Sequence, residues 1–215
     1  MEIKNQIKSG DYSFSFPNQY IVKEILPNTK CLDVGCWTGN LGKFLIENKN
    51  CVVDGMDFKS EVLEVARGNG YNETFLINLN SEFFDLKINK NKYQVIILAD
   101  VLEHLINPQG VLSYLKQLLA PGGQIIISLP NVAFILNRIF LLLGKWNYKE
   151  FGTLDKTHLR FFTIKSGVEM VKSAEFDIIK IEPYNQFGIL RFIKPLTWVF
   201  PSLFAYQFLI VAKPG

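Results

Sequence analysis

Apolar and polar residues alternate in blocks along the first two thirds of the chain. Three blocks carry apolar residues at helical spacing: 41–48, 60–68 and 108–120. Five shorter blocks are rich in apolar residues and have the length of strands: 30–35, 51–57, 73–78, 93–100 and 123–130. Nearly continuous apolar runs are typical of parallel strands covered on both faces. Strands that alternate with helices predict an α/β fold with a doubly wound, Rossmann-like sheet, which binds ligands at the carboxyl ends of its strands.

The last third of the chain is more apolar. It contains an unusually apolar helix candidate at 132–146 and strand candidates at 176–184 and 205–214. Segment 187–204 is apolar and aromatic, but two prolines interrupt it. We expect a leader at 1–29 with a short helix near 19–25, then a single domain at 30–215 with apolar lid segments at 132–163 and 187–204.

Composition narrows the class of protein. Of the 215 residues, 48% are apolar and 20% are charged, and the net charge is +3. These values indicate a globular protein and exclude a disordered tail, and because there is no basic run we expect no nucleic-acid partner. Cys31, Cys36 and Cys51 lack paired CxxC spacing, which indicates reduced, buried thiols. No segment resembles a signal peptide or approaches the ~20 apolar residues of a membrane span, so we expect a cytoplasmic protein.

A glycine-containing turn follows the first predicted strand. Gly35 and Gly39 flank this turn, and helix N–H groups follow it, so the backbone can approach a nucleotide-like ligand closely. The spacing to Gly42 differs from the Gly-x-Gly-x-x-Gly of dinucleotide-binding proteins, which disfavours a pyrophosphate. Asp57 ends the second strand, where a carboxylate can accept both ribose hydroxyls; the alternative is a turn or helix N-cap residue.

Several motifs occur together in a familiar order. They are LDVGCWTG (32–39), Asp57, ADVLEHL (99–105) and LLAPGGQIIISLPNV (118–132). With these motifs the chain resembles the class I S-adenosylmethionine-dependent methyltransferases from about residue 30 to residue 182. The segment GTLDKTHLRFFT (152–163) resembles a subgroup that includes ubiquinone-type O-methyltransferases and methyltransferases of bacterial surface-polysaccharide gene clusters.

The resemblance implies a seven-stranded sheet whose last strand is antiparallel, with S-adenosyl-L-methionine as cofactor. It implies that Asp33, Gly35 and Gly39 cradle the methionine end of this cofactor. Asp57 would hold the ribose and Phe58 would lie against the adenine. Asn78 and Ala99 complete the set of cofactor-binding residues.

Two residues depart from the family pattern. Trp37 stands where the glycine turn commonly has a middle glycine, which alters either the conformation of the loop or what stacks on it. Asn78 stands where many members have an aspartate near the adenine amino group, and its amide oxygen can still accept a hydrogen bond.

Methyl transfer to a hydroxyl needs positioning and a base. His158 is the preferred base, and Asp155 is its orienting partner or a second candidate. Arg160 would anchor an anion or the loop. The structural alternative is that His158 and Arg160 only hold segment 149–163 in place by hydrogen bonds.

The sequence also offers ligands for a divalent cation. Asp100, Glu103, His104 and the distant His158 could supply oxygen and nitrogen atoms. A similar set binds a metal in some RNA 3′-end methyltransferases of this superfamily. The Glu-His pair also begins a helix in many metal-free members, so we assign no metal here.

Cations lie among the apolar residues of the two lid segments. Arg138, Lys145, Arg191 and Lys194 are compatible with contact to anionic lipid. The alternatives for this apolar surface are core packing or contact with a second copy in a homodimer.

We therefore expect an S-adenosylmethionine-dependent methyltransferase that favours O-methylation of a small-molecule, sugar or lipid-linked acceptor. No Asn/Asp-Pro-Pro-aromatic motif follows the fourth strand, which argues against amino methylation of nucleic acids. The first alternative is a scaffold that binds the cofactor and transfers nothing. The second is a nicotinamide-dependent oxidoreductase, which the glycine spacing disfavours.

Overall fold

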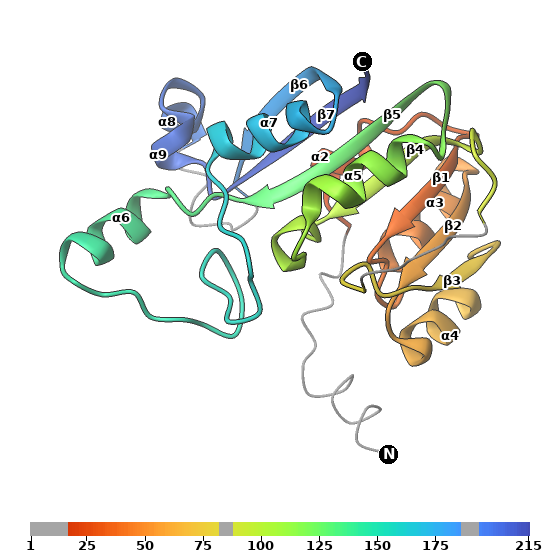
Figure 1. The fold of residues 1–215 in the computed structure, drawn as a ribbon, viewed down its shortest axis with the longest axis horizontal. Helices are drawn as coiled ribbons and strands as arrows, with labels where there is room; N and C mark the ends of the chain where they lie inside the picture. The colour runs from red at the N-terminus through yellow and green to blue at the C-terminus, as the bar shows by residue number, and fades with distance from the viewer. Residues whose placement is uncertain (1–16, 82–87, 186–193) are drawn as a thin grey trace.

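The computed structural model describes residues 17–81, 88–185 and 194–215. Its strands form one seven-stranded sheet in the order β3-β2-β1-β4-β5-β7-β6 (Figure 1). Their bounds are β1 Lys30–Val34, β2 Val52–Asp57, β3 Thr74–Leu76, β4 Tyr93–Ala99, β5 Leu119–Pro130, β6 Phe176–Tyr184 and β7 Gln207–Pro214. Strands β1 to β5 pair in parallel, and β7 is antiparallel to both β5 and β6. The predicted doubly wound sheet with an antiparallel last strand is therefore confirmed.

Helices cover both faces of the sheet. The helices are α2 Gln19–Val22, α3 Asn40–Lys49, α4 Ser60–Gly68, α5 Pro108–Lys116, α6 Ile135–Leu142, α7 Ile164–Ser173, α8 Lys194–Val199 and α9 Pro201–Phe204, with a 3-10 turn η1 at Leu102–His104. Helices α5 and α7 pack on one face in a core with Leu32 and Val34, whereas α2, α3 and α4 pack on the other with Cys31 and Val53. Alternate residues of a strand point to opposite faces, so one strand serves both cores.

Two predicted helices are shorter than the sequence pattern indicated. The helix predicted at 108–120 ends at Lys116, because Leu119 pairs with Tyr93 and starts β5. The helix predicted at 132–146 covers Ile135–Leu142 only. Before it, Asn131 accepts the N–H of Ala133 and forms a turn; after it, Gly144 has a φ of 70°. A left-handed residue ends a helix, as glycine commonly does.

Helix α2 lies within the segment predicted as a leader, and its Ile21 is fully buried. Residues 1–16 of that leader and residues 187–193 of the predicted 187–204 lid, including Arg191, lie outside the described residues. In the described parts, no helix has both the length and the apolar character needed to cross a membrane.

Candidate active site

The turn after β1 meets the end of β2 and the loop after β4 at the carboxyl edge of the sheet. The N–H groups of Gly35 and Cys36 both donate to the carbonyl of Met56 in β2. Gly35 has a φ of 69°, and a Cβ there would lie 2.7 Å from Cγ2 of Val101, which follows β4. Only glycine tolerates this backbone and this approach. Gly35 thus joins the glycine turn to the β4 loop.

Tyr71 occupies a slot formed by glycines. A Cβ on Gly39, Gly42 or Gly55 would lie 2.2–2.7 Å from atoms of its ring. The Tyr71 hydroxyl donates to Oδ2 of Asp33 at 2.6 Å and accepts the N–H of Gly42 at 3.0 Å. Tyr71 thereby fixes the Asp33 carboxyl against the first turn of α3.

Burial dominates the chemistry of Asp33, which is 3% exposed. It raises the pKa of this carboxyl to about 7; the hydrogen bond from Tyr71 lowers it, and the nearby charge of Asp57 raises it. A cation placed beside Asp33 would favour the ionised carboxylate. Asp33 therefore suits a ligand that brings a positive charge.

The backbone of Trp37 and Lys59 binds Asp57. The N–H of Trp37 donates to Oδ2 at 3.0 Å, and the N–H of Lys59 donates to Oδ1 at 3.1 Å. Trp37 has a φ of 50°, so it keeps the left-handed conformation that glycine adopts more easily. A glycine would adopt this conformation without strain, so the ring of Trp37 is what this position adds to the loop.

Exposed aromatic rings flank this carboxylate. The rings of Trp37 and Phe58 are 50% and 62% exposed, and Nζ of Lys59 lies 4.8 Å from the first ring centroid and 5.3 Å from the second. An exposed ring beside a carboxylate suits a base-and-ribose ligand.

Asn78 and Ala99 lie on either side of this region in the sheet order. Asn78 follows β3, is exposed, and accepts the N–H of Asn80 at its amide oxygen. A carbonyl oxygen has two lone pairs, so one acceptor position remains. Ala99 ends β4, pairs with Ser128 of β5 and is partly buried.

Segment 149–163 is held on the loop after β4. The N–H groups of Leu159 and Arg160 both donate to the backbone carbonyl of Glu103, and Nη2 of Arg160 donates to the carbonyl of Ile106 at 2.7 Å. Nδ1 of His104 lies 3.2 Å from the backbone oxygen of Thr157. Arg160 is therefore an anchor of the loop.

This docking brings together Glu103, His104 and His158. Their possible ligand atoms all lie within 4.8 Å of one another, and the two imidazole centroids are 4.9 Å apart. The side chains of Glu103 and His158 are 1% and 6% exposed, with Oε1 and Nε2 4.0 Å apart. Among the described residues, the buried Glu103 Oε2 and His158 Nδ1 have no hydrogen-bond partner. Unsatisfied buried polar atoms are costly and concentrate at functional sites.

Burial disfavours the charged forms of Glu103 and His158 and so shifts their pKa values in opposite directions. It raises the pKa of Glu103 well above its usual value, and the charges of Asp100 and Asp155 act in the same direction. It also lowers the pKa of His158, as does His104, whereas Asp155 raises it. A neutral imidazole above its pKa can accept a proton.

Asp100 and Asp155 lie differently from their predicted roles. The Asp100 carboxylate accepts Ser128 Oγ and Gln207 Nε2, and among the described residues it is not part of the Glu103 cluster. Oδ1 of Asp155 accepts the N–H and the hydroxyl of Thr157, so its described partner is Thr157 rather than the His158 ring.

No local sequence pattern marks Tyr71 as a site residue. Its signal is spatial: Gly39 and Gly42 lie at the start of α3, Gly55 lies in β2, and they meet Tyr71 only when the sheet forms. Glu103 was considered only as a metal ligand or helix-start residue, because its burial beside His158 depends on how segment 149–163 folds back.

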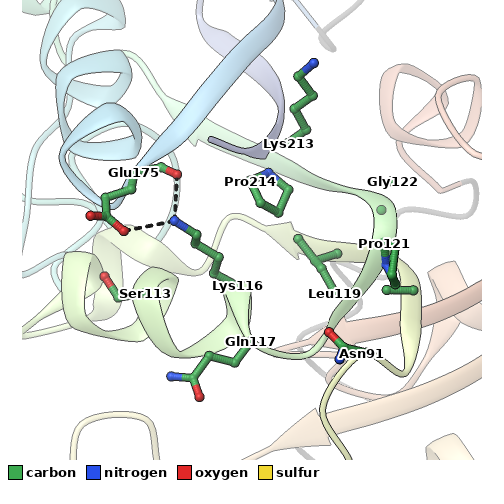
Figure 2. Close-up of a pocket in the computed structure, with 12 residues that line it drawn as sticks. Asn91, Ser113, Lys116, Gln117, Leu119, Pro121, Gly122, Glu175, Lys213 and Pro214 are labelled. Carbon is green, nitrogen blue, oxygen red and sulfur yellow. Dashed lines mark hydrogen bonds and ion pairs between the residues drawn. The ribbon is translucent and has the colours of Figure 1, made fainter.

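A surface cavity of about 540 Å³ lies elsewhere (Figure 2). Leu119 at the start of β5 and Pro214 at the end of the antiparallel β7 line it, and Lys116 beside it pairs with Glu175. This is the amino end of the parallel strands. Because open α/β sheets bind ligands at the carboxyl ends, we assign the site to the opposite edge.

Comparison with known proteins tests the family. A family model described as a methyltransferase domain matches residues 16–181. The chain belongs to this methyltransferase family. The methyltransferase resembles the "Ubiquinone biosynthesis O-methyltransferase" of Vibrio atlanticus, with 34% identity over 117 residues, 54% of this chain and 48% of the relative. That of Salmonella arizonae is 27% identical over 183 residues, 83% of this chain and 62% of the relative. The methyltransferase thus spans about half the length of some curated relatives.

Solved structures show the same fold. An S-adenosylmethionine-dependent methyltransferase from Mesorhizobium loti matches with a TM-score of 0.64 and 14% identity, covering 90% of this chain and 95% of the other. One from Thermotoga maritima, described as a possible histamine N-methyltransferase, matches with a TM-score of 0.66 and 14% identity. That match covers 100% of this chain and 95% of the other. Family and fold are those of class I S-adenosylmethionine-dependent methyltransferases, and S-adenosylmethionine is the cofactor, as the sequence predicted.

Proposed function

We propose that this methyltransferase transfers a methyl group to a hydroxyl of a small-molecule, sugar or lipid-linked acceptor. The observation that carries the proposal is the contact between Gly35 and Val101. It places the glycine turn beside the loop that carries Glu103, so a cofactor held at the turn lies near the Glu103–His158 cluster. The names of the curated relatives favour O-methylation.

The described residues fit the cofactor. Asp33 would bind the ammonium of its methionine end, which supplies the cation that a buried carboxyl favours. Asp57 would accept the ribose hydroxyls with the lone pairs that Trp37 and Lys59 leave free, and Phe58 would stack on the adenine. When bound, S-adenosylmethionine supplies a methyl group already activated by a sulfonium.

His158 would accept the proton of the acceptor hydroxyl. Its lowered pKa keeps the imidazole neutral at neutral pH, and its buried Nδ1 has no hydrogen-bond partner among the described residues. A bond forms between the acceptor oxygen and the methyl carbon, the carbon–sulfur bond breaks, and the proton moves to the imidazole.

Calorimetric titration with S-adenosylhomocysteine and, separately, with NADH tests the cofactor before any acceptor is known. Binding of S-adenosylhomocysteine alone supports the proposal, whereas preference for NADH would support the oxidoreductase. Turnover is then measured on a panel of phenols, sugars and lipid-linked hydroxyls. Cofactor binding without turnover on any of them would favour the silent scaffold.

Glu103, His104 and His158 also offer one oxygen and two nitrogens to a divalent cation. Removal of metal ions with EDTA is therefore the second experiment. If His158 acts as the base, the rate survives dialysis against EDTA. If the rate is lost and returns with added Mg²⁺ or Zn²⁺, the cluster holds a metal and the assignment of His158 as a free base is wrong.

A further inference from the structure

Helix α6 presents its apolar side to the outside. Its exposed residues are apolar except Arg138, and they include Leu136, Ile139, Phe140, Leu141 and Leu142, with exposed fractions from 40% to 87%. The only buried residue in this helix is the polar Asn137. A helix on the surface of a water-soluble domain normally shows the reverse arrangement, with its apolar stripe toward the core.

Specific contacts fix this orientation. Nδ2 of Asn137 donates to the carbonyl of Val132 at 3.0 Å and to Oγ1 of Thr153 at 2.8 Å. Just before the helix, Phe134 is buried and packs edge-on against Tyr206. Because the polar side is held by the protein, the leucines cannot turn inward without breaking buried hydrogen bonds.

Helix α8 extends the apolar surface. Trp198 and Val199 of α8, and Phe200 that follows it, are 54–66% exposed. Figure 1 shows α6, α8 and α9 at the same end of the molecule, beyond the end of β5. The carbonyl of Ser202 in α9 accepts hydrogen bonds from Asn131 and Arg138, which ties the two regions together.

The charge around this surface is mostly positive, and the exposed Glu150 beside Lys149 pairs with Lys156. The sequence contains no acidic residue between Glu103 and Glu150, and none after Glu182. Lys145 and Lys149 are exposed just beyond α6, and the aromatic Trp146 and Tyr148 lie between them. Apolar residues flanked by basic and aromatic residues are typical of helices that lie in a membrane interface.

We propose that α6, together with the exposed face of α8, docks on the surface of an anionic lipid bilayer. A second copy of the chain fits less well, because a symmetric interface would bring Lys145 and Lys149 of both copies together while the nearby Glu150 already pairs with Lys156. The proposal concerns where the protein sits and does not depend on the proposed methyl transfer.

Vesicle flotation tests the proposal with the 215-residue chain. The probes are vesicles of phosphatidylcholine with and without phosphatidylglycerol. The variant is Leu141→Glu/Leu142→Glu, at side chains that are 57% and 87% exposed, so the fold should be retained. The matched control is Leu26→Glu, which is 74% exposed in the turn between α2 and β1.

We expect the wild type and Leu26→Glu to float with the anionic vesicles and less with neutral ones. The double variant should bind about tenfold more weakly or worse, because two leucines no longer enter the apolar phase. Equal flotation of all three proteins, or none for the wild type, would overturn the proposal. Light scattering that shows a dimer lost only in the double variant, without vesicle binding, would instead assign the surface to a second copy. Titration with S-adenosylhomocysteine on the same samples tests the methyltransferase separately.

Discussion

Replacing Tyr71 by Phe removes one hydroxyl and leaves the ring in its slot. Two buried hydrogen bonds disappear, one to Oδ2 of Asp33 and one from the N–H of Gly42. The wild-type pKa of Asp33 is raised to about 7 by burial, and the Tyr71 hydrogen bond restrains this rise. In Tyr71→Phe the pKa therefore increases further, and less Asp33 is ionised at neutral pH.

The magnitude follows from these contacts. Each lost buried hydrogen bond costs about 1–3 kcal/mol, so stability should fall by roughly that amount or somewhat more. If Asp33 binds the cofactor ammonium, each additional pKa unit weakens binding at neutral pH by up to about tenfold. In the wild type, affinity should increase as pH rises through about 7, since ionisation of Asp33 strengthens the ion pair. In Tyr71→Phe this increase should move to higher pH.

The assay is calorimetric titration with S-adenosylhomocysteine across a pH series, paired with chemical denaturation. Tyr93→Phe is the matched control, because Tyr93 is also buried and donates to a buried carboxylate, Asp54, at 2.9 Å. It should lose comparable stability and keep its cofactor affinity. If Tyr71→Phe loses stability like Tyr93→Phe but binds with the wild-type affinity and pH profile, Asp33 does not hold the ammonium.

Further substitutions probe the rest of the site. Asp33→Asn should stabilise the protein at pH 8 by on the order of 1–3 kcal/mol in thermal denaturation, while weakening cofactor binding. The folded pKa of Asp33 lies above its ordinary 3.8, so stability falls as pH rises between these values, and the gain should vanish below about pH 4. Asp57→Asn keeps an acceptor for Lys59 yet should weaken S-adenosylhomocysteine binding about tenfold or more; unchanged affinity would exclude Asp57 as the ribose ligand. His158→Gln should lower kcat about 10²-fold or more with little change in cofactor affinity. The wild-type rate should fall only when the pH drops below 6.5, because the pKa of His158 is lowered from that value and the protonated imidazole cannot act as a base. A full rate in the variant would exclude His158 as the base. Trp37→Gly should relieve about 1 kcal/mol of backbone strain but weaken adenosine binding if the ring stacks on the ligand, which titration with adenosine alone would show.

The positions of the strands along the chain were predictable from sequence because apolar runs and glycine turns are local signals, whereas the antiparallel last strand was implied only by the family resemblance. The end of α5 was not predictable, since Leu119 fits a helix equally well until β4 is present to pair with it. The true length of α6 depended on the turn at Asn131, whose side chain contacts the α9 region, distant in sequence.

For the site, Asp57 could be predicted from its position at the end of the second strand, whereas Asn78 and Ala99 were implied only by the family resemblance. Tyr71 could not be predicted from its position, because its partners meet only through the sheet. His158 was identified as a residue type of interest, whereas its neighbour Glu103 depended on how segment 149–163 folds back.

That fold-back is made largely through the backbone. Leu159 and Arg160 donate main-chain N–H groups to a main-chain carbonyl of Glu103, so apart from the Arg160 guanidinium and the Thr153 hydroxyl this attachment does not depend on the side chains of segment 149–163. The residues above the site can therefore be exchanged while the sheet and its glycine turn stay as they are. Such a segment suits transplantation: loops from other methyltransferases that keep Thr153 and His158 could be grafted between residues 149 and 158 to create new acceptor preferences while the cofactor-binding turn stays unchanged.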